Sequence, residues 1–391
     1  MSRRRPLVAL ERCGDYDVAN VAHALERALS PFGGMGTFVR PGQRVMLKVN
    51  LLNKNEPEKA VTTHPALVRA VVRAVKAAGA SDVAIGDSPG GRTTTASARS
   101  LFEVSGMAAA AAEEGARLVL LDDDVVRHPS PGGKLYTSFN LGREAIEADV
   151  LIDLPRLKTH GFMQMTGAVK NLFGCIPGLE KAQFHVKVPD RDDFADMLVD
   201  LLLACRPALS IMDAVIGMEG EGPSAGNPKQ IGALLVSPDA MALDVVAAAI
   251  AGFDPMEVYT IAAAQRRGLG PRDVDEVEIA GADWREIAPE SFAHPARDIT
   301  AGMPPRLRKW ARARVSSKPV LGRPTDCTGC RTCEKDCPVK AIRVESGRPS
   351  FDYDACIRCY CCQELCPEHA IDLKTPWFVR SLVLRGGSKR A

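Results

Sequence analysis

The chain has 391 residues, which is too long for one small core and indicates two or three folded units. Its formal net charge of +2 predicts no nucleic-acid partner from overall charge. No apolar run reaches the about 18 residues of a membrane span, and residues 6–10 are too short for the apolar core of a signal peptide. We therefore expect a cytoplasmic protein without a transmembrane segment.

From residue 6 to residue 287, short apolar runs alternate with alanine-rich amphipathic segments. Strands alternating with helices of this length predict an α/β domain, residues 1–300, with a largely parallel sheet and helices on both faces. In such a sheet, ligands bind beyond the carboxyl ends of the strands, so the loops there are expected to carry the function. The predicted strands are 44–49, 82–85, 117–121, 150–154, 209–213 and 232–236, and the predicted helices are 18–29, 65–78, 98–114, 192–205 and 240–251.

The loop after the second predicted strand combines an acid, a serine and two adjacent glycines in the run Gly86-Asp87-Ser88-Pro89-Gly90-Gly91. Paired glycines let the backbone approach a ligand, and Ser88 or Thr93 can cap the next helix. The run is neither GxGxxG nor a Walker A loop, so it predicts no nucleotide site. Two interpretations stay open: an ordinary strand-to-helix turn, and an anion-binding loop that uses Asp87 and Ser88.

The loop after the fourth predicted strand is the most basic part of this domain. Residues 155–187 hold five cations and two histidines, opposed by the single acid Glu180. Thr166 can cap a short helix that contains Lys170 and Asn171, and helix N-termini add to anion binding. The pattern predicts an electropositive pocket for a carboxylate or phosphate. The alternative for each lysine is a solvated basic loop. The charged residues are Arg156, Lys158, Lys170, Lys181 and Lys187, and the histidines are His160 and His185.

The glycine-rich segment 213–228 predicts a flexible or close-approach loop, such as a lid. Its acids Asp213, Glu219 and Glu221 are either solvated carboxylates or, with Asp87, ligands of a divalent cation. Asp244 lies in an apolar helix, where we expect a paired structural carboxylate.

The composition changes after Pro295. Residues 302–325 contain seven lysines and arginines and no acid, which predicts a basic linker over 301–325 around Trp310. A basic apolar tail, 375–391, ends the chain. Both segments are suited to an anionic membrane surface, to an acidic electron carrier, or to packing between domains, with their charges in water.

Between these segments, two runs of four cysteines share the spacing CxxCxxCxxxC, and each is followed by proline. Each cysteine recurs 29 residues later, from Cys327 to Cys356 and from Cys337 to Cys366. This is the bacterial ferredoxin pattern for two [4Fe-4S] clusters, in which the fourth cysteine of a run ligates the other cluster. The predicted ligands, within a module at 326–374, are Cys327, Cys330, Cys333 and Cys366 for cluster one, and Cys356, Cys359, Cys362 and Cys337 for cluster two.

A structural zinc site also uses CxxC pairs, but it would leave the third cysteine of each run and both prolines unexplained. Cys361 is a ninth thiol outside the repeat, where a small filler is expected rather than a redox group. Cluster thiolates together with widely spaced spare thiols fit a reducing compartment better than a disulfide framework.

The larger domain resembles the bacterial and archaeal domain of unknown function numbered 362, which is often followed by a ferredoxin module. The resemblance covers roughly residues 5–290. It implies an iron–sulfur protein and its architecture, but no substrate. The motifs that carry it are residues 48–51, His64-Pro65, Gly86-Asp87-Ser88, residues 155–178, residues 213–223 and Ala242-Leu243-Asp244.

The first functional hypothesis is a reductase, in which electrons from a redox partner protein pass through both clusters to a small anionic organic molecule or a bound flavin. No motif supports the flavin. Lys158, Lys170 and Asn171 would hold the anion, and His160 or His185 would supply a proton. Thr166, Asp87 and Ser88 complete the expected binding residues. The alternatives are a non-enzymatic electron carrier or adaptor and, less favoured, a protein that binds a metal or cofactor precursor.

Overall fold

The structure is a computed structural model that describes residues 5–91, 93–296 and 315–377, together with residues 307, 311 and 379. About half of the expected basic linker, including Trp310, and most of the expected tail lie outside these residues. Within them, no helix is both long and apolar enough to cross a membrane.

The larger domain is built on a ten-stranded sheet whose main path runs β12-β1-β11-β10-β7-β2-β3-β4, with the hairpin β8–β9 attached to β10. The β2, β3, β4 and β7 strands pair in parallel, whereas β11 is antiparallel to both β1 and β10. The strands are β1 (Leu7–Arg12), β2 (Arg44–Lys48), β3 (Asp82–Asp87), β4 (Arg117–Leu120), β7 (Val150–Asp153), β8 (Arg156–His160), β9 (Gln164–Thr166), β10 (Leu209–Glu219), β11 (Asn227–Ser237) and β12 (Glu278–Gly281).

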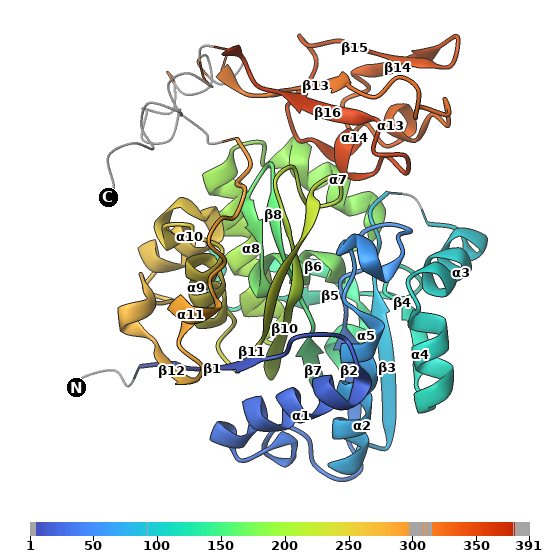
Figure 1. Cartoon of the computed structure of the whole chain (residues 1–391). Helices are drawn as coiled ribbons and strands as arrows, with labels where there is room; N and C mark the ends of the chain where they lie inside the picture. The colour runs from blue at the N-terminus through green and yellow to red at the C-terminus, as the bar shows by residue number, and fades with distance from the viewer. Residues whose placement is uncertain are drawn as a thin grey trace.

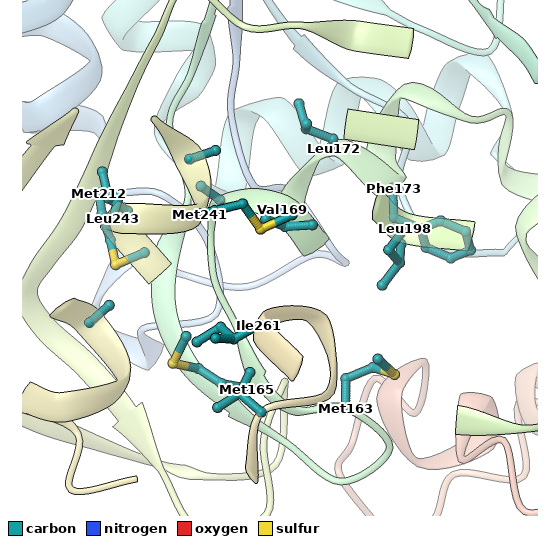
Figure 2. Packing of buried hydrophobic residues seen from close by; sticks show 14 of the residues in the cluster. Met163, Met165, Val169, Leu172, Phe173, Leu198, Met212, Met241, Leu243 and Ile261 are labelled. Atoms are coloured by element: carbon teal, nitrogen blue, oxygen red, sulfur yellow. The ribbon is translucent and has the colours of Figure 1, made fainter. Parts of the chain in front are cut away.

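Helices cover both faces of this sheet, as predicted (Figure 1). Side chains alternate along the strands, so β2 sends Val45 and Leu47 into one core and Met46 into the other. Figure 2 shows the core that contains Met46, where Val169 lies beside Met241 and Met165 beside Ile261. The helices are α1 (Val18–Leu29), α2 (Pro65–Ala77), α3 (Thr95–Val104), α4 (Met107–Glu114), α5 (Arg143–Glu147), α6 (Ala168–Asn171), α7 (Gly178–Lys187), α8 (Arg191–Cys205), α9 (Ala240–Ile250), α10 (Tyr259–Arg266) and α11 (Trp284–Ile287).

Three elements differ from the prediction. The expected helix 98–114 is two helices, α3 and α4, because Gly106 breaks it in the left-handed region at φ 76°. The segment after β7, expected as a loop, contains the hairpin β8–β9. The segment 213–228, expected as a flexible loop, lies largely in β10 and β11, whose antiparallel pairing continues to Glu219 and Asn227.

The C-terminal module repeats one small unit. It consists of β13 (Lys318–Leu321), α13 (Thr332–Lys335), β14 (Ile342–Glu345), β15 (Arg348–Phe351), α14 (Cys361–Glu364) and β16 (Ile371–Lys374), with the pairs β13–β16 and β14–β15. The amide of Ala341 donates to Cys337 Sγ at 3.2 Å, and that of Ala370 to Cys366 Sγ at 3.3 Å. The cysteine repeat is therefore a repeat in structure as well.

The two repeats have different surroundings. The first cysteine loop is open, and Cys330 and Arg331 are exposed. Their counterparts in the second loop, Cys359 and Tyr360, are only 9% and 3% exposed. Figure 1 shows the module, in orange and red, lying over the larger domain with α14 facing it. The second repeat is the one buried in this contact.

Candidate functional site

A cavity of about 860 Å³ lies between the larger domain and the module. The loops after β2 and β3, the hairpin β8–β9, and helices α6 and α7 form one side, and helices α13 and α14 with Cys337 form the other. The cavity brings together seven of the eight residues that the sequence predicted for this domain's site, and His160 is the exception. The seven are Asp87, Ser88, Lys158, Thr166, Lys170, Asn171 and His185.

Asp87 is fixed by partners beneath the cavity. The fully buried amine of Lys48 lies 2.8 Å from Asp87 Oδ1, which also accepts the amide of Ser88 at 2.8 Å. The other oxygen, Oδ2, accepts the amide of Leu51 at 2.6 Å. A Cβ atom at Gly174 would overlap both Asp87 and Lys48, so only glycine fits there. Asp87 therefore holds the loops together, and both of its oxygens are already occupied.

Lys158 is held by a chain of amides. Its amine donates to Asn50 Oδ1 and to the carbonyl of Val61, both at 2.7 Å. Asn50 donates to Asn171 Oδ1 at 2.9 Å, and Asn171 donates to Asp153 Oδ1 at 2.7 Å. Burial, followed by the charge of Lys170, lowers the pKa of Lys158 well below its usual value. Asn171 thus positions the partner of Lys158.

Lys170 is half-buried and differs from the buried lysines of the site. Its amine has no hydrogen bond or ion pair with any residue that the structure describes, and it lies 5.9 Å from the centre of the Phe173 ring. Burial lowers the pKa of Lys170, and the nearby Glu364 and Cys361 partly oppose this effect. A half-buried ammonium with unused donors at the cavity is suited to a bound anion.

Lys181 lies in the first turn of α7. Its amine contacts the carbonyl of Ser88 and donates to Ser88 Oγ at 2.8 Å. Ser88 Oγ in turn donates to Asp122 Oδ1 at 2.6 Å. Burial lowers the pKa of Lys181 to about 8. The result is an ammonium group in the cavity wall, linked by hydrogen bonds to the half-buried Asp122.

The two histidines lie in different places. His185 lines the cavity and stacks on Phe194, and burial together with Lys170 lowers its pKa to about 3. His160 lies behind the wall, where Nδ1 accepts the amides of Phe162 and Met163 at 3.0 and 3.3 Å. Its Nε2 is 3.2 Å from Glu364 Oε1. The backbone contacts keep His160 out of the cavity, so its position does not support the expected direct proton transfer.

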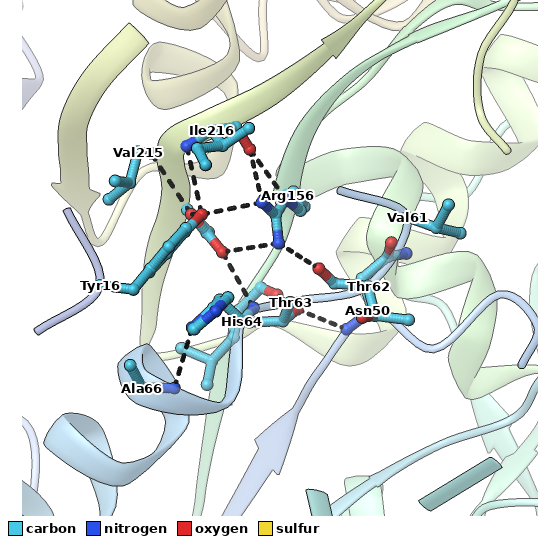
Figure 3. Close-up of polar contacts among 12 residues, drawn as sticks. Tyr16, Asn50, Val61, Thr62, Thr63, His64, Ala66, Arg156, Val215 and Ile216 are labelled. Atoms are coloured by element: carbon cyan, nitrogen blue, oxygen red, sulfur yellow. Dashed lines mark hydrogen bonds and ion pairs between the residues drawn. The ribbon is translucent and has the colours of Figure 1, made fainter. Parts of the chain in front are cut away.

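Two of the five cations expected in the pocket lie elsewhere. Lys187 is exposed on α7 over the ring of Phe184. Arg156 is buried 3.4 Å from Asp213, and donates to Tyr16 at 2.8 Å (Figure 3). Tyr16 itself donates to Asp213 Oδ1 at 2.7 Å. Asp213 is therefore the partner of Arg156 and Tyr16, which corrects both of its expected roles, as a solvated carboxylate and as a cation ligand.

The N-terminus of α6, which was expected to contribute anion donors, is already capped. Asp244 on α9 accepts the amide of Ala168 at 2.6 Å and that of Val169 at 3.1 Å. Asp244 is thus the structural carboxylate that the sequence indicated, and an anion in the cavity depends on side-chain donors.

The predicted cluster ligands lie near enough to one another to shift each other's pKa. Burial, and then the charges of Cys330, Cys366 and Cys327, raise the pKa of Cys333 to about 11. Burial also raises the pKa of Cys362, with contributions from Cys359, Cys356, Cys333 and Cys337. The cysteines that raise the pKa of Cys333 are the other three predicted ligands of cluster one. Those that raise the pKa of Cys362 include the other three predicted ligands of cluster two. Among the described residues, no three His, Cys, Asp or Glu side chains come close enough together to hold a single metal ion.

The module side of the cavity was missed by sequence reasoning. Cys337, a predicted ligand of cluster two, lies in the wall with Cys361, Glu364, Lys335 and Lys340. Glu364 is 8% exposed, and burial raises its pKa, against the effect of Lys170 and Lys158. The available signal was Cys361, a spare thiol beside a ligand on the buried repeat. Cys361 was interpreted as filler because a docking partner for that helix cannot be read from spacing.

Comparisons with known proteins match one family model to the larger domain and another to the C-terminal module. Residues 45–249 match the family model of the domain of unknown function DUF362, and residues 320–367 match a 4Fe-4S dicluster domain. A thylakoid-associated protein of Synechocystis sp. is 39% identical over 310 residues, which cover 77% of this chain and 92% of that protein. A component of an ion-translocating oxidoreductase complex of Methanosarcina acetivorans is 44% identical over 48 residues, 12% of this chain and 18% of that protein.

Among solved structures, the lactate racemase apoprotein of Thermoanaerobacterium thermosaccharolyticum aligns with a TM-score of 0.38 and 15% identity. The alignment covers 61% of this chain and 55% of that one.

Proposed function

The chain belongs to the DUF362 family and carries a 4Fe-4S dicluster module, and from this we propose an iron–sulfur oxidoreductase that reduces a small anionic organic molecule. The observation that carries the proposal is the shared cavity, whose wall contains the amines of Lys170 and Lys181 and the cluster ligand Cys337. The bound clusters would supply electrons singly, at potentials set by their surroundings. A lysine-lined cavity beside the predicted cluster ligand Cys337 favours this over an adaptor, which needs only a docking surface.

Lys170 is assigned the main role in binding the anion, because its ammonium has no competing acceptor among the described residues. Lys158 adds the donor that Asn50 and Val61 leave free. Asn171 acts indirectly, by holding Asn50. The proposal includes no flavin, since neither matched domain and no sequence motif implies one.

Reduction of the bound molecule also requires a proton, and we assign Lys181 as its donor. Its pKa of about 8 keeps most of the group protonated at neutral pH, yet able to release a proton. The chain through Ser88 to Asp122 provides a route for reprotonation. His185, neutral at this pH, is placed to orient the molecule by hydrogen bonding. His160 is assigned a positioning role, because its Nε2 faces Glu364 from behind the wall.

An anaerobic assay tests the proposal. The protein is reduced with dithionite, freed of excess reductant and mixed with a panel of organic acids, while the visible absorbance reports the oxidation of the clusters. At least one acid should reoxidise the parent faster than buffer does. Lys170→Met should slow that reaction about tenfold or more, since a charged hydrogen bond contributes about 1.5–3 kcal/mol.

The matched control is Lys187→Met, which removes an exposed lysine outside the cavity and should react like the parent. If no acid in the panel accelerates reoxidation, or if both variants behave alike, the reductase proposal is wrong and an electron carrier becomes the better hypothesis.

Electron delivery requires a redox partner, and we propose that this partner binds at the open first repeat. The description of the Synechocystis relative as thylakoid-associated also supports peripheral contact with a membrane. Sedimentation of the full chain with anionic vesicles tests that contact.

A further inference from the structure

We propose that the back of the cavity is a carboxylate subsite formed by Lys158, Thr166 and Lys170, and that its ligand is a carboxylic acid with an uncharged, apolar body. One part of this inference rests on the proposed function, namely that the bound carboxylic acid is the molecule that is reduced. Binding of a carboxylate is a separate property and can be measured without electron transfer.

The local fold brings the three residues together. Lys158 and Thr166 are direct partners in the antiparallel pair β8–β9. Directly opposite residues in such a pair have Cβ atoms about 4.5–5.5 Å apart, on one face of the sheet. Lys170 follows Thr166 on the next element, α6, and all three line the cavity. The subsite is therefore built on a hairpin and the helix that follows it.

The donors of these residues are largely unused. An ammonium group has three N–H donors, and those of Lys170 have no acceptor among the described residues. Lys158 uses two of its three, for Asn50 and Val61. The hydroxyl of Thr166, a residue only 4% exposed, has no hydrogen-bond partner in the described part of the chain. Unpaired donors are costly when buried, as in Lys158 and Thr166, and a bound acceptor would relieve that cost.

The charge balance favours one negative charge. When Lys158, Lys170 and the buried acid Glu364 are all ionised, the subsite carries about one net positive charge. Burial lowers the pKa of both lysines, and an anion between them would counter that effect.

The further donors that a phosphate dianion favours are already occupied. The guanidinium of Arg156 is bound to Tyr16, Thr62 and Ile216. The first amides of α6 are bound to Asp244.

The rest of the ligand is apolar. Phe173, Leu52, Leu365 and Pro223 line the same cavity, and its volume suits an organic molecule rather than a bare anion. Lys181, Lys335 and Lys340 also line the cavity, outside the group formed by Lys158, Thr166 and Lys170. An acid anchored at Lys170 would place its body between the larger domain and Cys337.

Calorimetric titration of the oxidised, cluster-loaded protein tests the subsite with benzoate, octanoate, benzamide and phenyl phosphate. We expect one of the two carboxylates to bind, and to bind at least about tenfold more tightly than benzamide or phenyl phosphate. Lys170→Met should weaken carboxylate binding about tenfold or more, and Thr166→Val a few-fold. Lys187→Met should bind like the parent.

Melting temperatures provide a control for folding. Lys170→Met removes a half-buried charge that has no partner among the described residues, so it should melt close to the parent temperature or above it. The bound carboxylate should raise the melting temperature of the parent more than that of the variant. Failure of both carboxylates to bind, equal binding of benzamide, tighter binding of phenyl phosphate, or unchanged binding by Lys170→Met would each overturn the carboxylate subsite.

The outcomes separate this inference from the proposed function. Carboxylate binding that depends on Lys170, without reoxidation of reduced clusters by any acid, would keep the subsite and reject the reductase. Reoxidation by other anions, without carboxylate binding, would keep the reductase and reject the subsite.

Discussion

Lys181 combines burial with a hydrogen-bonded route toward solvent, and this combination predicts a pH dependence. Burial lowers its pKa to about 8, so the ammonium form that donates a proton is present below pH 8 and is lost above it. The rate constant of acid-dependent cluster reoxidation should be nearly constant below pH 7 and decrease about tenfold per unit well above pH 8. Stopped-flow absorbance between pH 6 and 9.5 measures this profile.

Lys181→Met should lower that rate constant about a hundredfold at pH 7 and remove the decrease centred on pH 8, since no other donor replaces the amine. Lys187→Met should keep both the rate and the profile of the parent. A parent profile that stays constant up to pH 9.5 would assign the proton to another group.

Asp153 is a second buried group with a predictable pH effect. It is fully buried, and burial raises its pKa to about 8 although Lys48 and Asn171 oppose the shift. The folded protein therefore keeps a proton that the unfolded chain releases above its usual pKa near 4, so the free energy of unfolding decreases as pH rises toward 8. Asp153→Asn mimics the protonated form and should reduce that decrease.

Melting temperatures at pH 6 and pH 8.5 check this. The difference between the two values should be smaller for Asp153→Asn than for the parent, and unchanged for the exposed control Asp123→Asn. An equal difference in all three proteins would mean that Asp153 is ionised throughout.

At the scale of single residues, much of the candidate site could be predicted from the sequence. Lys158, Lys170 and Asn171 follow a strand in a parallel region of the sheet, so their convergence with Asp87 was expected from topology. His160 could not be placed, because its position depends on two amides of the turn after β8. The unused donors of Lys170 were likewise invisible, since sequence does not show which acceptors lie nearby.

At the scale of elements, the hairpin β8–β9 carries most of the site and is fixed at its first residue. Arg156 joins β8 to Asp213 and Ile216 on β10 and to Thr62 in the loop before α2. Lys158 lies two residues further along this strand. The network therefore sets the position of the hairpin relative to the cavity.

Arg156→Met should leave Asp213 as an uncompensated buried charge and lower the free energy of unfolding by about 3–5 kcal/mol. The urea midpoint of the loss of helical circular dichroism measures the change. Arg12→Met removes an exposed ion pair with Glu286 and should change the stability by less than about 1 kcal/mol. Equal midpoints for the two variants would show that the Arg156 network adds little.

The hairpin was predicted as a loop for a physical reason. Every residue of β8 and β9 is buried, so the alternation of polar and apolar residues that marks a half-exposed strand is absent. Lysine, arginine and histidine in such a strand resemble a solvated segment until their partners are known. By contrast, α1 begins and ends as predicted, because its apolar face and the capping Asp17 are local signals.

At the scale of the whole molecule, the cavity exists only where the two parts meet. The carbonyl of Glu364 accepts hydrogen bonds from Asn53 and Ser224, both at 2.9 Å, and Gln363 donates to the carbonyl of Glu221 at 2.9 Å. Gly90 lies against Leu365 so closely that a Cβ atom would overlap the leucine side chain. Helix α14 therefore fits onto the loop after β3.

Gly90→Phe should force α14 away from this loop. We expect the cluster absorbance to be retained, the radius of gyration from small-angle scattering to increase, and acid-dependent reoxidation to be lost, because the cavity wall is displaced. Gly36→Phe is the matched control, since a Cβ atom at Gly36 meets nothing within 4 Å. A Gly90→Phe protein with the parent's scattering curve and activity would show that the contact is not needed.

The module could be predicted from eight cysteines, but its contact with the larger domain could not. Cysteine spacing predicts the cluster ligands, whereas the contact depends on Gln363, Leu365 and other side chains that touch the larger domain. Repeat symmetry treats both halves alike, and only the structure shows which one is covered.

The exposed half of the duplicated module can therefore serve as a comparison for the covered half. Three residues of the covered half have more exposed counterparts 29 positions earlier: Tyr360 corresponds to Arg331, Cys361 to Thr332, and Glu364 to Lys335. The members of each pair share one backbone geometry but differ in environment. Exchanging them one at a time would separate what a cluster-binding loop requires from what this particular docked protein requires, within one polypeptide.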